Sequence, residues 1–281
     1  MHPRSELHRG LARRLALAHR ALAGDDLLAL VSGSTVEDLT DELSDIDLCV
    51  AFDTLPAESV LQAAGAAAGA EPWHWQAGSL DEGGLVVAFR LVGIEAQIAY
   101  TTHARLRQDL DLLLVEHTPD TPLHKLAEGL LKAEALCGPA HLEALQARLS
   151  PFPPALGRAM AVHFIGQPTP WRTIRQLVER DALLWCRELQ GAACLRLLGA
   201  LCGLNGRYFT TFQLKRLHRL AATLPLAPSA LAERIEQVLM LPARPGFEQL
   251  HRLETEVLDL LAAAWPDLDL APARQRLRGF P

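Results

Sequence analysis

β-like patterns are confined to the first part of the chain, and this asymmetry constrains the fold more than any other feature. The expected strands are short apolar or alternating runs at 26–32, 46–52, 73–76, 85–92 and 94–101. Helical spacing predicts two helices among them, at 4–23, ended by Gly24, and at 56–68. The first ~100 residues therefore predict a small mixed α/β domain.

From residue 103 onward every periodic segment is helix-like, and proline clusters punctuate the series. The expected helices are 103–116, 122–136, 139–149, 154–165, 171–202, 211–223, 228–240 and 246–264, with a frayed tail at 272–281. The chain is therefore predicted to be α+β, with a mixed-sheet domain over 1–102 and an all-helical domain over 103–281.

Composition restricts the partners and the compartment. The 281 residues suit two domains, and 49% apolar with 21% charged residues is ordinary for a globular protein. A net charge of −6 provides no global field for nucleic acid or anionic membrane. No secretory signal and no apolar run of the ~20 residues that a membrane span needs is visible. The five cysteines have no metal-site spacing, so we expect buried thiols in a cytoplasmic protein that can still self-associate.

The segment 31–50 combines a glycine-serine turn with two spaced carboxylates. An apolar strand ends at Gly33-Ser34, where glycine admits a phosphate close to the backbone and the serine adds a hydroxyl donor. A helix starting there would also aim its free N–H groups at the anion, although residues 35–44 can equally form a loop. The segment predicts a phosphate-binding turn.

Asp45 and Asp47 lie two apart at the start of the second strand, so alternation places both carboxylates on one face. Neighbouring carboxylates repel each other, and a cation relieves that cost. Oxygen ligands shared with substrate phosphates favour Mg²⁺. The competing interpretation is a strand with two exposed acids beside an ordinary turn.

This arrangement resembles the signature of the polymerase-β-like nucleotidyltransferase superfamily. Gly33, Ser34, Asp45 and Asp47 match it position by position, and an appended helical domain is typical of its small-molecule members. The resemblance implies a third carboxylate on a later strand, for which Glu95 is the candidate, with a salt-bridged strand residue as the alternative. It also implies Mg²⁺ bound by these three acids and a nucleoside triphosphate gripped by the turn.

The implied reaction transfers a nucleoside monophosphate from the triphosphate to an acceptor hydroxyl, expected to belong to a small molecule such as an aminoglycoside-like compound. Transfer to tRNA or to protein is an alternative. The net negative charge of the chain argues weakly against an RNA acceptor. Residues 35–44 depart from the family pattern because they contain four acids and no base. That departure supports a further alternative, a non-catalytic nucleotide-binding or regulatory module.

A second segment of interest is 204–218 in the helical half. It places Lys215 on a helix that Thr210 or Thr211 would cap, after an Asn-x-x-Tyr-Phe run found in nucleotidyltransferase-like bacterial proteins that it resembles. Lys215 is therefore a candidate for contacting the triphosphate. The plainer interpretation is a helix-turn packed by Tyr208 and Phe209, with Lys215 in solvent.

Overall fold

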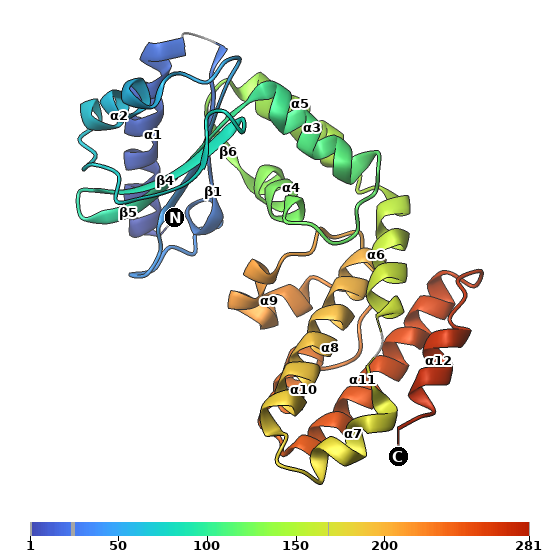
Figure 1. Ribbon diagram of the computed structural model, residues 1–281. Coiled ribbons are helices and arrows are strands. Elements are labelled where there is room, and N and C mark those ends of the chain that lie inside the picture. Colours follow the sequence, from blue (N-terminus) through green and yellow to red (C-terminus); the bar gives the residue numbers. More distant parts are fainter. Residues whose placement is uncertain (1, 24–25, 168, 281) are drawn as a thin grey trace. The chain divides into compact units, whose positions relative to one another are not determined.

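The computed structural model describes residues 2–23, 26–167 and 169–280, so the expected helix stop at Gly24 lies outside the described residues. The chain forms two compact units (Figure 1). The first contains Met1–Val115 and Leu126–Pro151; the second contains Glu116–Lys125 and Phe152–Pro281. The first unit thus extends beyond the expected boundary at residue 102.

The first unit is built on one six-stranded sheet of order β3-β4-β5-β2-β1-β6. β2 and β5 are parallel, and the other neighbouring pairs are antiparallel. Its strands are β1 (Leu28–Ser32), β2 (Ile46–Phe52), β3 (Trp75–Ser79), β4 (Gly84–Leu91), β5 (Ile94–Thr102) and β6 (Glu134–Cys137). The α+β class predicted from the sequence is confirmed.

β6 contradicts the expectation that strands stop after residue 102. The helix predicted over 122–136 ends at Lys132 as α4 (Leu123–Lys132), and the next residues pair antiparallel with β1. Four residues without alternation carry no strand pattern of their own. Their conformation comes from backbone hydrogen bonds to β1, a tertiary contact that periodicity does not register.

Helices α1 (Pro3–Ala23) and α2 (Glu58–Ala67) cover one face of this sheet (Figure 1). Leu11 and Leu15 of α1 and Leu61 of α2 belong to the same buried cluster as Ile46 and alternate residues of the central strands. Because side chains alternate along a strand, the residues between them project from the opposite face. That opposite face carries the two aspartates.

The first unit also contains α3 (His103–Leu114), α5 (Pro139–Leu149) and the part of α4 from Leu126 onward. Thr102 caps α3 by accepting a hydrogen bond from the backbone N–H of Arg105 at 3.1 Å. Gln146 of α5 donates to the Leu130 carbonyl at the end of α4, at 3.0 Å. This bond joins the end of α4 to α5 within the first unit.

The second unit is helical, as predicted. Its elements are α6 (Pro154–Gly166), α7 (Trp171–Val178), α8 (Leu183–Leu204), η3 (Thr211–Arg216), α9 (Leu217–Ala222), α10 (Leu231–Met240), α11 (Ala243–Ala264) and α12 (Ala271–Leu277). The single helix expected over 171–202 is two helices, and the expected frayed tail contains α12. In η3, Thr210 is the cap, through a reciprocal capping box with Gln213.

Two further expectations concern the membrane and the cysteines. Among the described helices, none is both long and apolar enough to cross a bilayer. All five cysteines are free thiols, four of them buried and Cys49 partly buried. Burial raises the pKa of Cys49 and of Cys194, each to about 12, so both stay protonated at neutral pH.

Candidate functional site

The turn after β1 is shaped around the carboxylate of Asp47. Gly33 has a φ of +69°, in the left-handed region that favours glycine. A Cβ atom added at Gly33 would lie 2.5 Å from Asp47 Oδ2. The helix expected after the turn is replaced by a single 3₁₀ turn over Gly33–Thr35, so no α-helix N-terminus faces an anion in the described segment 33–45. The backbone conformation therefore favours glycine, and a larger residue would displace the carboxylate of Asp47.

We expect Gly33→Ala to destabilise the protein by about 1–3 kcal/mol, because it combines a strained φ with a clash against Asp47. Thermal and denaturant unfolding measure the loss. Gly93→Ala is the matched control, since Gly93 has a φ of +78° and nothing within 4 Å of an added Cβ. Equal losses in the two variants would show that strain alone acts and that Asp47 does not rest against the turn.

Asp45 and Asp47 share one face of the sheet, as predicted. Asp47 is the antiparallel partner of Ser32 and the parallel partner of Gln97 on β5. Neighbouring partners in a sheet project to the same side. Gln97 donates from Nε2 to Asp45 Oδ2 at 3.2 Å, so the carboxylate of Asp45 also lies over the face of Asp47. The two acids therefore sit together beside the glycine turn.

Glu95 lies on the same face, two residues before Gln97 on β5. Its Oε1 is 3.3 Å from His74 Nε2, and its antiparallel partner across β4 is Arg90. No group of three or more His, Cys, Asp or Glu side chains in the described part of the chain is placed to hold a metal ion. The assignment of Glu95 as third metal ligand therefore stays a prediction, and Arg90 brings a cation to this face that the sequence did not reveal.

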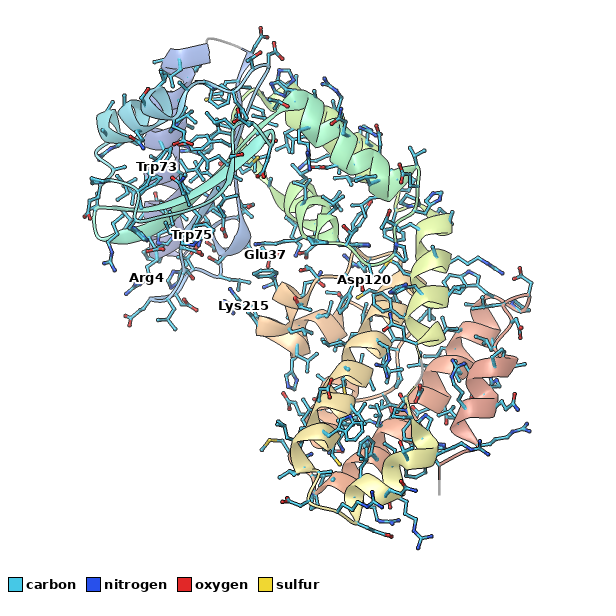
Figure 2. The ribbon with its side chains drawn as sticks, in the orientation of Figure 1. Arg4, Glu37, Trp73, Trp75, Asp120 and Lys215 are labelled. Carbon is cyan, nitrogen blue, oxygen red and sulfur yellow. The ribbon has the colours of Figure 1, made fainter. Side chains whose placement is uncertain are left out.

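The acidic loop 35–44 is neutralised by basic residues from elsewhere in the first unit. Lys132 of α4 forms ion pairs with Glu37 and with Glu128, and Glu37 is visible beside that helix (Figure 2). Arg4 of α1 binds Glu42 at 2.8 Å. Glu37 and Glu42, whose charges would repel a triphosphate, are thus paired with basic side chains and anchor the loop.

Arg9 of α1 is the most buried of these anchors. Its Nε binds Glu134 Oε2 of β6 at 3.1 Å, and its Nη2 donates to the Val36 carbonyl at 3.4 Å. Its side chain is 12% exposed, and its Nη1 lies 3.9 Å from Asp38 Oδ1. One guanidinium therefore joins α1, the acidic loop and β6.

We expect Arg9→Ala to cost about 1–3 kcal/mol of unfolding free energy, because it leaves the Val36 carbonyl without its donor and leaves Glu134 with only the exposed Arg13 as ion-pair partner among the described residues. Arg4→Ala is the control and should cost less than about 1 kcal/mol, since the Arg4 side chain is 47% exposed. Urea unfolding of both variants compares them. Similar costs would mean that the loop is not held by Arg9.

His8 lies beneath Asp45 and was not singled out by the sequence. It is 3% exposed and forms a hydrogen bond with the backbone of Asp45. Burial lowers the pKa of His8, partly offset by that hydrogen bond and by the charge of Asp45. Its Nδ1 has no hydrogen-bond partner among the described residues. Helical spacing alone marks His8 only as one position of α1, so no signal in the sequence identified it.

Lys215 belongs to the second unit, where it is exposed on η3 (Figure 2). Its Nζ lies 5.7 Å from the centre of the Phe212 ring, and the Nζ of Lys125 lies 3.9 Å from the same centre. Tyr208, 3% exposed, packs edge-on against Phe152, in line with the plainer interpretation of this segment. A role for Lys215 in nucleotide binding stays a prediction.

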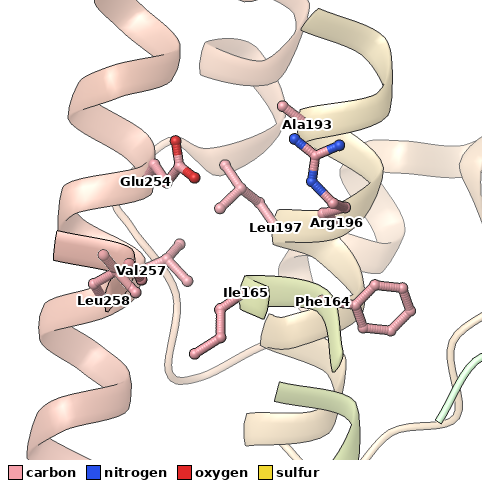
Figure 3. Close-up of a pocket in the computed structure, with 9 residues that line it drawn as sticks. Phe164, Ile165, Ala193, Arg196, Leu197, Glu254, Val257 and Leu258 are labelled. Carbon is pink, nitrogen blue, oxygen red and sulfur yellow. The ribbon is translucent and has the colours of Figure 1, made fainter. Parts of the chain in front are cut away.

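The second unit also contains a small pocket (Figure 3). Its lining is mainly apolar and includes one acid and one base, Glu254 and Arg196; the others are Phe164, Ile165, Ala193, Leu197, Val257, Leu258 and Ala273. Arg196 donates to Thr169 Oγ1 at 2.9 Å. A lone acid in an apolar lining does not provide the paired oxygens that phosphoryl chemistry needs.

The structure is similar to solved structures, whereas the sequence comparisons find no match. No family model matches the chain, and no curated protein is similar to it. The structure matches a crystal structure of a nucleotidyltransferase-like protein from Exiguobacterium sibiricum 255-15 with 14% sequence identity, over 91% of this chain and 76% of the other, at a TM-score of 0.45. A likeness of that degree decides neither substrate nor activity, so the case for function rests on the residues of the first unit.

Proposed function

We propose that the first unit catalyses Mg²⁺-dependent transfer of a nucleoside monophosphate from a nucleoside triphosphate to an acceptor hydroxyl. One observation carries the proposal: the carboxylates of Asp45 and Asp47 share a face of the sheet beside the Gly33 turn, and Gln97, the strand partner of Asp47, donates to Asp45 on that face. Paired carboxylates next to a phosphate-binding turn are what metal-assisted phosphoryl transfer requires.

The residues fit the metal that the proposal needs. Asp45 and Asp47 supply carboxylate oxygens, the ligand type that Mg²⁺ prefers. Gly33 leaves the space beside Asp47 Oδ2 that a Cβ atom would fill. Bound there, the metal would neutralise phosphate charge and make the acceptor hydroxyl more acidic.

The chain's own residues would position the reactants. Gly33 and Ser34 bind the outer phosphates through backbone N–H groups and the serine hydroxyl. The acceptor oxygen attacks the α-phosphorus as the bond to the pyrophosphate oxygen breaks, and pyrophosphate leaves. Glu95 takes the proton of the acceptor hydroxyl, and its bond with His74 holds it at the edge of the site. Arg90, opposite Glu95, offsets the negative charge of this face.

The acceptor is proposed to be a small hydroxylated molecule of the aminoglycoside type. The net charge of −6 disfavours a polyanionic acceptor such as tRNA. The assay that tests the proposal includes tRNA and protein as alternative acceptors. The full-length protein is incubated with Mg²⁺ and each of the four labelled triphosphates, together with an aminoglycoside panel, bulk tRNA or no added acceptor. Label on a small molecule supports the proposal; label on tRNA or on the protein changes the acceptor class.

A second candidate is a nucleotide-binding module without transfer activity. One observation favours it: no third carboxylate among the described residues is placed with Asp45 and Asp47 to hold a metal ion. Binding of a triphosphate without transfer to any acceptor would select this candidate. Failure to bind any triphosphate in the presence of Mg²⁺ would eliminate both.

A further inference from the structure

Gln97 occupies the central place in the proposed site. It is the parallel cross-strand partner of Asp47, and its Nε2 donates to Asp45 Oδ2 at 3.2 Å. The side chain is partly buried and projects from the face that carries both aspartates. Glu95 lies one alternation step earlier on β5 and forms a hydrogen bond with His74. Gln97 is paired in register with Asp47 and hydrogen-bonded to Asp45, so Gln97 rather than Glu95 is the β5 residue beside the two aspartates.

An amide at this position has two distinct capabilities. Its NH₂ group donates hydrogen bonds, which stabilise the charged carboxylate of Asp45 when no cation is bound. Its carbonyl oxygen is a neutral metal ligand of the kind found in oxygen-ligated sites. Rotation of the terminal amide exchanges one group for the other without moving the backbone.

We propose that Gln97 is the third ligand side chain of this site, contributing its carbonyl oxygen where a carboxylate would otherwise complete the set. This inference rests on the proposed function, because it takes Asp45 and Asp47 as the other two ligands. A set with two negative charges binds a divalent cation more weakly than one with three. The metal is therefore expected to bind weakly to the protein alone and to gain affinity when triphosphate oxygens join it.

The test measures Mn²⁺ binding to the full-length protein by electron paramagnetic resonance, without nucleotide, so no activity is needed. Gln97→Glu should raise the affinity by on the order of tenfold through its added charge, and Gln97→Met should lower it by a similar factor. If Gln97 only positioned Asp45, both substitutions would weaken binding, since neither side chain donates a hydrogen bond. Tighter binding by Gln97→Glu together with weaker binding by Gln97→Met therefore places the side chain at position 97 on the metal, whereas weaker binding by both variants contradicts that placement.

Glu95→Gln is the matched control on the same strand and face, and its Mn²⁺ affinity should stay within about twofold of wild type. A loss in Glu95→Gln equal to that in Gln97→Met, or no change in either Gln97 variant, overturns the inference. Asp47→Asn tests the underlying proposal separately: if it binds Mn²⁺ as wild type does, the metal is not at this site and the proposed function fails with it. Thermal unfolding of each variant checks that the first unit is folded.

Discussion

Replacing Asp47 by asparagine is expected to reduce nucleotidyl transfer by on the order of 10³-fold or more and to weaken Mn²⁺ binding at the same site. The substitution keeps the size of the side chain and removes the charge that would hold the metal. Chemistry of this kind depends mainly on positioning and charge neutralisation, so a lost ligand has little to replace it. Turnover is measured with the acceptor that the labelling assay identifies.

The fold of this variant should be unaffected or slightly more stable, because Asp47 and Asp45 repel each other on one face. Thermal unfolding of Asp47→Asn is compared with that of wild type in the absence of divalent cation. Asp53→Asn is the matched activity control: Asp53 directly follows the same strand, is exposed, and lies at its opposite end. Turnover within about twofold of wild type is expected for it. Equal turnover by Asp47→Asn and Asp53→Asn would remove Asp47 from the mechanism.

The position and length of a strand were predictable where its residues point alternately into the core and to the face of the candidate site. β2 occupies 46–52 as expected, because its apolar residues must alternate to bury Ile46, Leu48 and Val50 against α1 and α2. The same alternation predicted that Asp45 and Asp47 share a face, and the bond from Gln97 agrees with it. Where one face of a strand is buried, the sequence pattern also determines what the other face presents.

Features that depend on long-range pairing were not predictable. β6 has no pattern of its own, and its place beside β1 depends on backbone hydrogen bonds between distant segments. The cations that balance the acidic loop lie far from it in sequence, as Lys132 does from Glu37. The sequence of loop 35–44 therefore indicated an uncompensated negative charge, whereas in the structure basic side chains from other elements form ion pairs with its acids. Gln97 was overlooked as a ligand because an amide is a weaker sequence signal than an acid.

A partly buried acid in the second unit leads to the largest expected effect of pH on stability. Glu254 of α11 lies in the pocket of Figure 3, accepts a hydrogen bond from the Trp171 side chain, and has an Oε2 with no partner among the described residues. Burial raises the pKa of Glu254 from 4.5 to about 7, although the charge of Arg196 acts in the opposite direction. Burial also lowers the pKa of Arg196, so neither charge is well solvated.

The sign of the effect follows from the raised pKa. Between the unfolded value of 4.5 and the folded value of about 7, the folded protein keeps a proton on Glu254 that the unfolded chain has released. Stability due to this group is therefore present below about pH 4.5 and is lost as the pH rises through about 7. From pH 5 to pH 8 the wild-type unfolding free energy should fall by about 2–3 kcal/mol from this group alone.

Glu254→Gln should remove that fall, because glutamine cannot ionise and still accepts a hydrogen bond from Trp171. Urea unfolding at pH 5, 6, 7 and 8 gives the slope for each protein. Glu256→Gln on the same helix is the matched control: Arg234 holds the pKa of Glu256 below its ordinary value through hydrogen bonds of 2.6 and 2.8 Å. Its contribution is lost only under more acidic conditions, so the slope from pH 5 to pH 8 should equal that of wild type. If Glu254→Gln keeps the wild-type slope, Glu254 titrates as an ordinary exposed acid and the pocket does not hold it protonated.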